Sequence, residues 1–111
     1  MGRFIKGDIV VVPFPFSDLS QSKKRPALVL ADLNGEDLIL SQITSQNIYD
    51  PYAVEISEND FENGSLNKVS NIRPNKIFTA DEGIILYKVA HLNEEKIQEV
   101  TDKIISIFVE E

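Results

Sequence analysis

The sequence predicts a small, strongly bent β barrel closed by one C-terminal helix, within a single domain that spans residues 1–111. Short apolar segments, many of them rich in β-branched residues, recur between turn signals. No helical pattern separates them, which disfavours a parallel sheet with crossover helices. One amphipathic helical pattern follows the last of these segments, and the chain is long enough to bury its own core.

The expected strands begin near the N-terminus. Residues 8–14 form an apolar strand whose exit is marked by prolines, and the polar residues 17–24 form a loop. Asn34-Gly35 is a strong hairpin signal, because both positions of a tight turn favour a positive φ. Further strands are expected at 26–31, 38–44, 53–56 and 84–92. Between the last two of these lie an acidic, turn-rich stretch at 57–68 and a mixed apolar and basic stretch at 69–79.

The helix is expected to start after Asn93, whose side chain can cap it. Glu94 and Glu95 would then lie in the first turn, where the helix dipole favours negative charge. Apolar residues recur at helical spacing on one face, which we expect to pack on the sheet. These residues are Ile97, Val100, Ile104, Ile107 and Phe108.

Composition removes several kinds of chemistry. The chain has no cysteine, so disulfides, thiolate metal sites and thiol nucleophiles are excluded. His91 is the single histidine, so a ribonuclease mechanism with two histidines is impossible, and we expect a structural role for it. Adjacent acids lack metal-ligand spacing and no Gly-rich phosphate loop is present, so we expect neither a metal nor a cofactor. A charged N-terminus and the lack of a long apolar run predict a cytoplasmic protein that does not enter a membrane.

The charge is unevenly distributed along the chain. The net charge is −7, which argues against a nucleic-acid partner. Residues 1–31 nevertheless carry a net charge of +3 and residues 67–90 carry +2, whereas residues 32–66 carry −8. A fold could bring the two basic stretches together into one patch, or they could form separate solvated faces.

The hairpin signal makes one pair of residues stand out. Pairing about Asn34-Gly35 places Arg25, at the end of the basic run Lys23-Lys24-Arg25, opposite Thr44 on the neighbouring strand. An arginine supplies a fixed fork of donors for two phosphate oxygens, and a threonine hydroxyl supplies one more. The pair could therefore hold a phosphate at a solvent-facing sheet edge, or it could be a surface arginine beside a threonine chosen for β-propensity.

Several blocks of sequence resemble the MazF/PemK-like toxins. They are GDIV at residues 7–10, RPALVL at 25–30, LSQITS at 40–45 and VSNIRPNKIFT at 69–79. Their order and spacing extend through nearly the whole chain. The stretch PFPFSD at 13–18 looks like the PemK-like branch of the family.

The resemblance implies a toxin of a type II toxin–antitoxin system. Such toxins have an SH3-like barrel, form homodimers and cleave single-stranded RNA without a metal. The family's catalytic arginine and threonine map onto Arg25 and Thr44, and the resemblance implies an antitoxin partner, for which we expect an acidic and apolar tail. We expect the RNA-binding residues to be Lys23, Lys24, Ser45, Tyr49, Arg73 and Lys76.

Other functions remain open at this stage. Tyr49 and Tyr52 could stack on splayed bases or pack in the core or a dimer interface. CcdB toxins share this barrel and bind DNA gyrase without cutting RNA, and a non-catalytic binding protein of that kind is the alternative. A DNA-binding regulator is disfavoured, because the sequence is acidic and has no helix-turn-helix pattern. No residue is assigned as the general base.

Overall fold

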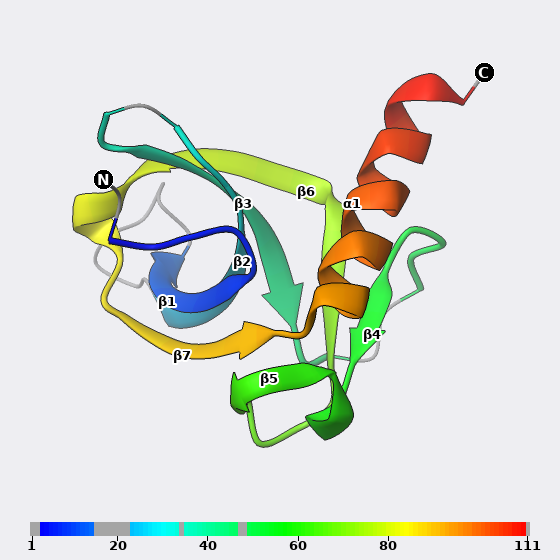
Figure 1. Cartoon of the computed structure of the whole chain (residues 1–111), viewed down its shortest axis with the longest axis horizontal. Helices are drawn as coiled ribbons and strands as arrows, with labels where there is room; N and C mark the ends of the chain where they lie inside the picture. The colour runs from blue at the N-terminus through cyan, green and yellow to red at the C-terminus, as the bar shows by residue number, and fades with distance from the viewer. Residues whose placement is uncertain (1–2, 15–22, 34, 47–48, 111) are drawn as a thin grey trace.

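The computed structural model describes residues 3–14, 23–33, 35–46 and 49–110 (Figure 1). These residues form strands, two short 3₁₀ helices and one α-helix. The elements are β1 (Asp8–Phe14), β2 (Lys23–Asp32), β3 (Asp37–Thr44), β4 (Val54–Ile56), η2 (Glu58–Asp60), β5 (Phe61–Gly64), β6 (Ser70–Asp81), η3 (Glu82–Ile84), β7 (Tyr87–Leu92) and α1 (Glu94–Val109).

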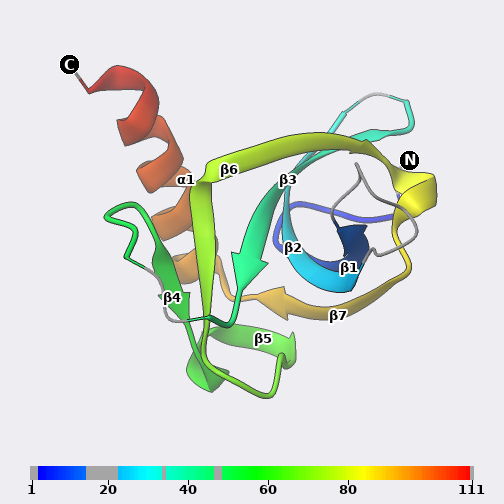
Figure 2. The ribbon, with the colours of Figure 1, turned by 180° about the vertical axis from the view of Figure 1, so that it is seen from behind.

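The strands form one antiparallel sheet in the order β4-β6-β3-β2-β1-β7-β5. Figures 1 and 2 show this sheet curled into a half-barrel, with α1 packed beside β4 and β6. The predicted class, a mainly β barrel with one C-terminal helix, is confirmed. Within the described residues, no helix has the length and apolarity that a membrane crossing needs.

Two apolar clusters fill the two faces of the sheet. Ile9 and Leu28 belong to the cluster that packs beneath Ile97 and Val100 of α1. Val10 and Val29, which point to the opposite face, belong to a second cluster. The central strands β1 and β2 are therefore buried on both faces, which explains why their sequences are continuous apolar runs instead of alternating ones.

Most predicted elements are confirmed, and the differences have local causes. Strand β2 begins at Lys23, so Lys23 and Lys24 belong to a strand and not to the expected loop, whose residues 17–22 lie outside the described residues. Strand β5 was not predicted, because its polar sequence is stabilised by backbone pairing with β7 and not by burial. Strand β7 begins only at Tyr87, since residues 82–84 form η3.

The start of the helix agrees with the prediction, whereas its last turns are more exposed than predicted. The Asn93 side chain accepts a hydrogen bond from the Lys96 backbone N–H at 2.8 Å. Ile97 and Val100 are buried as expected. Phe108, by contrast, is 75% exposed, so its assignment to the packed face was wrong. The last turns of α1 project away from the sheet (Figure 1), so Phe108 borders an open apolar hollow that it shares with Ile77 of β6 instead of packing in the core.

Candidate active site

The first feature of the site is the place where β2 and β3 stop pairing. Their pairing extends no further than Ala27 opposite Gln42. The residue before Ala27 is Pro26, which has no backbone N–H to continue the ladder. Extending the same register by two residues places Arg25 across from Thr44, as the sequence predicts. The ladder thus ends where the two predicted catalytic residues lie.

A pocket of about 320 Å³ opens at this point. Arg25 and Thr44 both line it, so the structure brings the predicted pair to one cavity. Strand β2 lies between β1 and β3, so the pocket lies at the end of central strands and not at the lateral edge of the sheet. Residues from several parts of the chain line it: Lys24, Arg25 and Pro26 at the start of β2, Ile43, Thr44 and Ser45 at and just after the end of β3, Leu66, Lys68 and Ser70 just before and at the start of β6, and Val11 of β1 and Tyr87 of β7.

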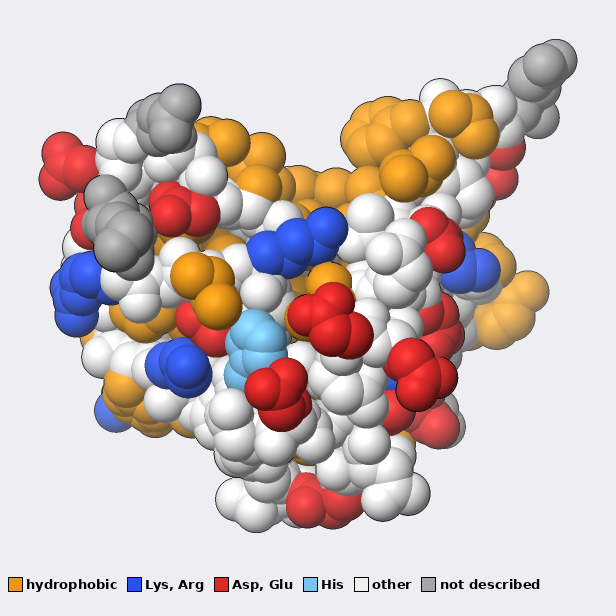
Figure 3. Space-filling view, viewed as in Figure 1, with side chains coloured by type: hydrophobic (Ala, Val, Ile, Leu, Met, Phe, Trp, Pro, Cys, Tyr) orange, Lys and Arg blue, Asp and Glu red, His pale blue; other side chains and the backbone are white. Residues whose placement is uncertain are grey.

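The described lining of this pocket carries positive charge and no negative charge. Lys24, Arg25 and Lys68 contribute three cations, and none of the lining residues is an aspartate or a glutamate. None of these three cations forms an ion pair with another described residue. Acidic side chains instead spread over other surfaces, including the face shown in Figure 3. In a chain with a net charge of −7, such a pocket favours an anionic group such as a phosphate.

Thr44 is more buried than the sequence suggested. Only 6% of it is exposed, so the expectation of a solvent-facing residue was wrong. The cause is that β3 is flanked by β6, where Thr44 pairs with Asn71. Its hydroxyl oxygen accepts a hydrogen bond from the Gln46 backbone N–H at 3.1 Å. This contact fixes the oxygen and leaves the hydroxyl hydrogen able to donate into the pocket.

Arg73 lies in a different environment from Arg25. Its Nε donates a hydrogen bond to Oδ2 of Asp50 at 3.0 Å, and the Asp50 carboxylate is only 2% exposed. Burial alone would raise the pKa of Asp50, but the Tyr52 backbone N–H and the Arg73 guanidinium outweigh it and lower that pKa below 3.8. Arg73 does not line the pocket. The structure therefore gives this arginine a partner within the protein.

Some of the remaining predicted RNA-binding residues line the pocket and others lie outside it. Lys24 and Ser45 line the pocket, whereas Lys23 and Lys76 are exposed outside it. Tyr49 is 98% exposed and does not line the pocket either. The hydroxyl of Tyr52, the other candidate for base stacking, donates to Oε1 of Glu110 at the end of α1. The sequence also places Phe14 and Phe16 directly before the loop at 17–24, where they would suit a dimer contact. Phe16 and the Phe14 side chain lie outside what the structure describes.

The single histidine has a structural contact, as expected. His91 Nδ1 lies 2.8 Å from Oδ1 of the buried Asp8, its partner across β1 and β7. Lys88 Nζ lies 3.4 Å from the same oxygen, and Oδ2 accepts from the Ile5 backbone N–H at 2.9 Å. These contacts join the N-terminal segment to β7, and none of the four residues lines the pocket.

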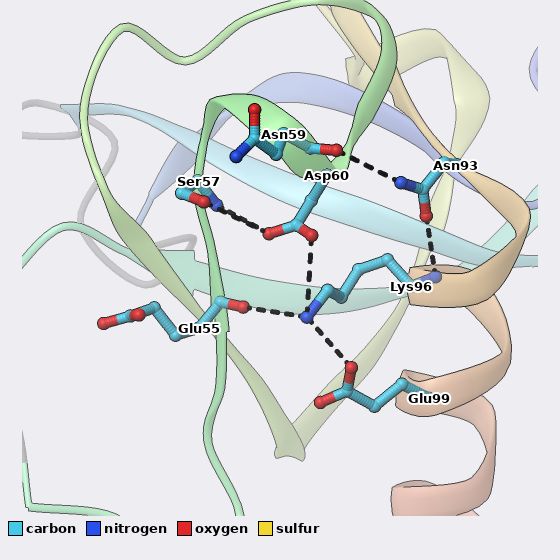
Figure 4. A network of polar contacts seen from close by, with 7 residues as sticks. All are labelled: Glu55, Ser57, Asn59, Asp60, Asn93, Lys96 and Glu99. Atoms are coloured by element: carbon cyan, nitrogen blue, oxygen red, sulfur yellow. Dashed lines mark hydrogen bonds and ion pairs between the residues drawn. The ribbon is translucent and has the colours of Figure 1, made fainter.

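A second polar network anchors η2 to the helix, as Figure 4 shows. Lys96 Nζ donates to Oε1 of Glu99 at 2.9 Å and to the Glu55 carbonyl oxygen at 3.3 Å, and it lies 3.8 Å from Oδ1 of Asp60. The Asn93 backbone N–H also donates to the Asp60 carbonyl oxygen at 2.8 Å. This network anchors η2, which precedes β5 and the pocket-lining residues Leu66, Lys68 and Ser70.

Three polar residues of the pocket were not predicted from the sequence. Lys68, Ser70 and Tyr87 come from parts of the chain that are distant from Arg25 in sequence. The one available signal was the positive charge of residues 67–90, which includes Lys68. Only the curled sheet brings that stretch to the end of β2.

A curled antiparallel sheet, a C-terminal helix and a cationic pocket at the end of two central strands define a class of small, mainly β proteins. A family model described as PemK-like, MazF-like toxin of type II toxin–antitoxin system matches residues 5–108. The chain therefore belongs to this toxin family. A comparison with curated protein sequences gives no match.

Solved structures with the same fold agree with this membership. One is MazF from Deinococcus radiodurans, with a TM-score of 0.73, 20% identity, and coverage of 95% of this chain and 96% of that one. A MazE–MazF structure from the same organism gives a TM-score of 0.74 at 19% identity, with 95% of each chain covered. An endoribonuclease from a mycobacterial species, in complex with its cognate antitoxin, gives 0.72 at 11% identity, covering 97% and 95%.

Proposed function

We propose that this toxin is an endoribonuclease that cleaves single-stranded RNA in the cytoplasm at selected short sequences. The observation that carries the proposal is the pocket that holds Arg25 and Thr44 together with two lysines and no described carboxylate. Membership in the toxin family supports it, and so do structural neighbours described as endoribonucleases.

The proposed reaction is a transesterification. The ribose 2′-hydroxyl releases its proton to solvent water as its oxygen attacks the adjacent phosphorus, the bond from phosphorus to the 5′-oxygen breaks, and the 5′-oxygen takes up a proton. The products are a 2′,3′-cyclic phosphate and a 5′-hydroxyl. Negative charge builds up on the phosphoryl oxygens during this step, so donors already aimed at them lower the barrier.

Arg25 is proposed to stabilise that charge with two parallel N–H donors and to deliver the proton to the leaving oxygen. It is a poor general base, because a guanidinium has a pKa above ~12. Thr44 is proposed to position the phosphate, since its oxygen already accepts from Gln46 and its hydroxyl hydrogen is left to donate. Lys24 and Lys68 add positive charge to the same pocket. No metal takes part in this scheme.

Two protein partners belong to the proposal. A homodimer would cover part of the exposed apolar surface that Figure 3 shows over the last turns of α1, where Ile105, Phe108 and Val109 are more than half exposed. An antitoxin with an acidic and apolar tail would neutralise the cations of the pocket. The tail and RNA should then compete in a titration, and simultaneous, independent binding of both would contradict this assignment.

The test of the proposed function is cleavage of labelled single-stranded RNA in EDTA. We expect cyclic-phosphate ends, formed at the same rate with and without the chelator. Loss of activity in EDTA, or ends that carry a 3′-hydroxyl, would contradict the mechanism. A toxin that binds gyrase or nucleic acid without catalysis would leave the RNA intact.

A further inference from the structure

The segment 66–70, just before and at the start of β6, lies between two hollows. Leu66, Lys68 and Ser70 line the cationic pocket described above. Asn67, Lys68 and Val69 line a second, open hollow of about 480 Å³. Lys68 lines both hollows. An extended ligand that occupied both would therefore pass Lys68.

The second hollow differs from the first in its chemistry. Its other lining residues are Ser57, Glu58 and Asn59, from η2 and the residue before it. The Glu58 carboxylate would repel a phosphate, whereas asparagine and glutamate side chains hydrogen-bond the edges of unstacked bases. Lys68 is the single cation of the described lining. The two hollows together therefore suit a strand with its phosphate near Lys68 and its base against η2.

The polar groups of the second hollow are held in place before any ligand arrives. Oε1 of Glu58 accepts a hydrogen bond from the Ser65 hydroxyl, whose oxygen accepts from the Asn67 backbone N–H at 2.8 Å. Asn67 has a φ of 64°, a left-handed conformation that asparagine tolerates better than most residues. Asp60 at the end of η2 is joined to α1 through Lys96 (Figure 4). The wall of the hollow formed by η2 is thus tied to α1 and to the turn at residues 65–67 by side-chain contacts.

We propose that this hollow is a base-recognition subsite for the nucleotide next to the scissile phosphate, with Lys68 holding the linking phosphate. The inference rests on the proposed nuclease function and adds to it a determinant of sequence selectivity. Oε2 of Glu58 has no partner among the described residues, and a carboxylate oxygen only accepts hydrogen bonds. Uracil offers only its ring N3–H, which is flanked by two carbonyl oxygens that the carboxylate repels, so the subsite selects a base with an exocyclic amino group (cytosine, adenine or guanine) and disfavours uracil.

The selectivity is tested by cleaving a randomised single-stranded RNA pool and sequencing the ends. At one position next to the cut, the wild-type protein should disfavour uracil by roughly tenfold, the lower range for one well-formed contact to a base edge. Glu58→Gln introduces an amide donor and should abolish this preference at that position alone. Glu62→Gln, on exposed β5 outside the hollow, is the matched control and should keep it.

Two further variants complete the test. Asn67→Gly keeps the left-handed backbone but removes the amide, so it should relax the same position even if Glu58→Gln folds poorly. Lys68→Ala should weaken RNA binding and reduce the slope of log K against log salt by about 0.7, the value for one phosphate contact on a single strand. Lys103→Ala on α1 is its control and should leave the slope unchanged.

The outcomes separate the subsite from the nuclease itself. An active wild-type enzyme whose cut-site preferences are the same in Glu58→Gln, Asn67→Gly and Glu62→Gln would overturn the subsite and leave the nuclease intact. An unchanged salt slope in Lys68→Ala would overturn the phosphate contact. A wild-type protein that cleaves none of the RNA would overturn the proposed function and the subsite together.

Discussion

Arg73→Ala tests whether Arg73 stabilises the fold or binds RNA. The side chain bonds Asp50, whose carboxylate is 2% exposed, while Arg73 itself is 23% exposed. Exposed ion pairs contribute ~0–1 kcal/mol, and breaking a fully buried one costs ~3–5 kcal/mol. For this partly exposed arginine we expect a loss of about 2 kcal/mol in the free energy of unfolding, or roughly 8 °C in Tm for a domain of this size.

The pH dependence of the loss identifies its cause. In the wild type the pKa of Asp50 is lowered below 3.8, so its ionised form stabilises the fold above that pH, and the contribution is lost as the pH falls through the lowered pKa. Without Arg73, burial is opposed only by the hydrogen bonds from the Tyr52 backbone N–H and from Asn75, so the pKa of Asp50 should be higher than in the wild type. The stability difference between wild type and variant should therefore be largest at neutral pH and narrow on acidification.

Urea unfolding of Arg73→Ala and of the exposed control Lys76→Ala, at pH 7 and at about pH 3, measures this difference. Lys76→Ala should lose no more than ~0.5 kcal/mol. A fully stable Arg73→Ala protein that has lost affinity for RNA would refute the structural role and restore the RNA-binding prediction.

Two further predictions concern packing and assembly. Gly64→Ala should cost more than 2 kcal/mol by thermal or urea unfolding, because at its φ of 74° a Cβ would lie 2.2 Å from the Val89 carbonyl oxygen. Gly35→Ala, at a φ of 118° with nothing within 4 Å, should show only the ~1 kcal/mol conformational cost, and equal losses in the two variants would contradict the steric argument. Light scattering at micromolar concentration should give about twice the chain mass of 12.5 kDa, and a clean monomer would contradict the proposed dimer.

Local signals in the sequence predicted the geometry of the central pair. The register of a tight turn at Asn34-Gly35 places Arg25 opposite Thr44, and Ala27 pairs with Gln42 in that register. Next to the turn the pairing is offset by one residue, with Asp32 opposite Leu38, and an irregularity between Val29 and Ala31 restores the predicted register. The helix start at Asn93 was predictable because a cap acts over three residues.

Features that depend on distant contacts could not be predicted. The partner of Arg73 lies 23 residues away in sequence, so its pairing with Asp50 has no local signal. Lys68 reaches the pocket only because the sheet curls. The polar sequence of β5 gives no strand signal, because pairing with β7 and not burial stabilises this strand. Thr44 was predicted to be exposed because its local sequence carries no signal for the pairing of β3 with β6.

Single-turnover cleavage of RNA by Arg25→Ala tests the central claim most directly. Loss of one donor that acts only in the transition state should lower the rate by roughly 10²–10³-fold, and Arg25→Lys should remain strongly impaired because a point charge cannot reproduce the fork. Thermal melts must show that both variants stay folded, which we expect since Arg25 forms no ion pair with a described residue. Thr44→Ser should retain most of the activity, and Thr44→Ala should lose part of it.

The account predicts a folded, nearly inactive Arg25→Ala protein. A folded Arg25→Ala protein that cleaves at the wild-type rate would contradict it.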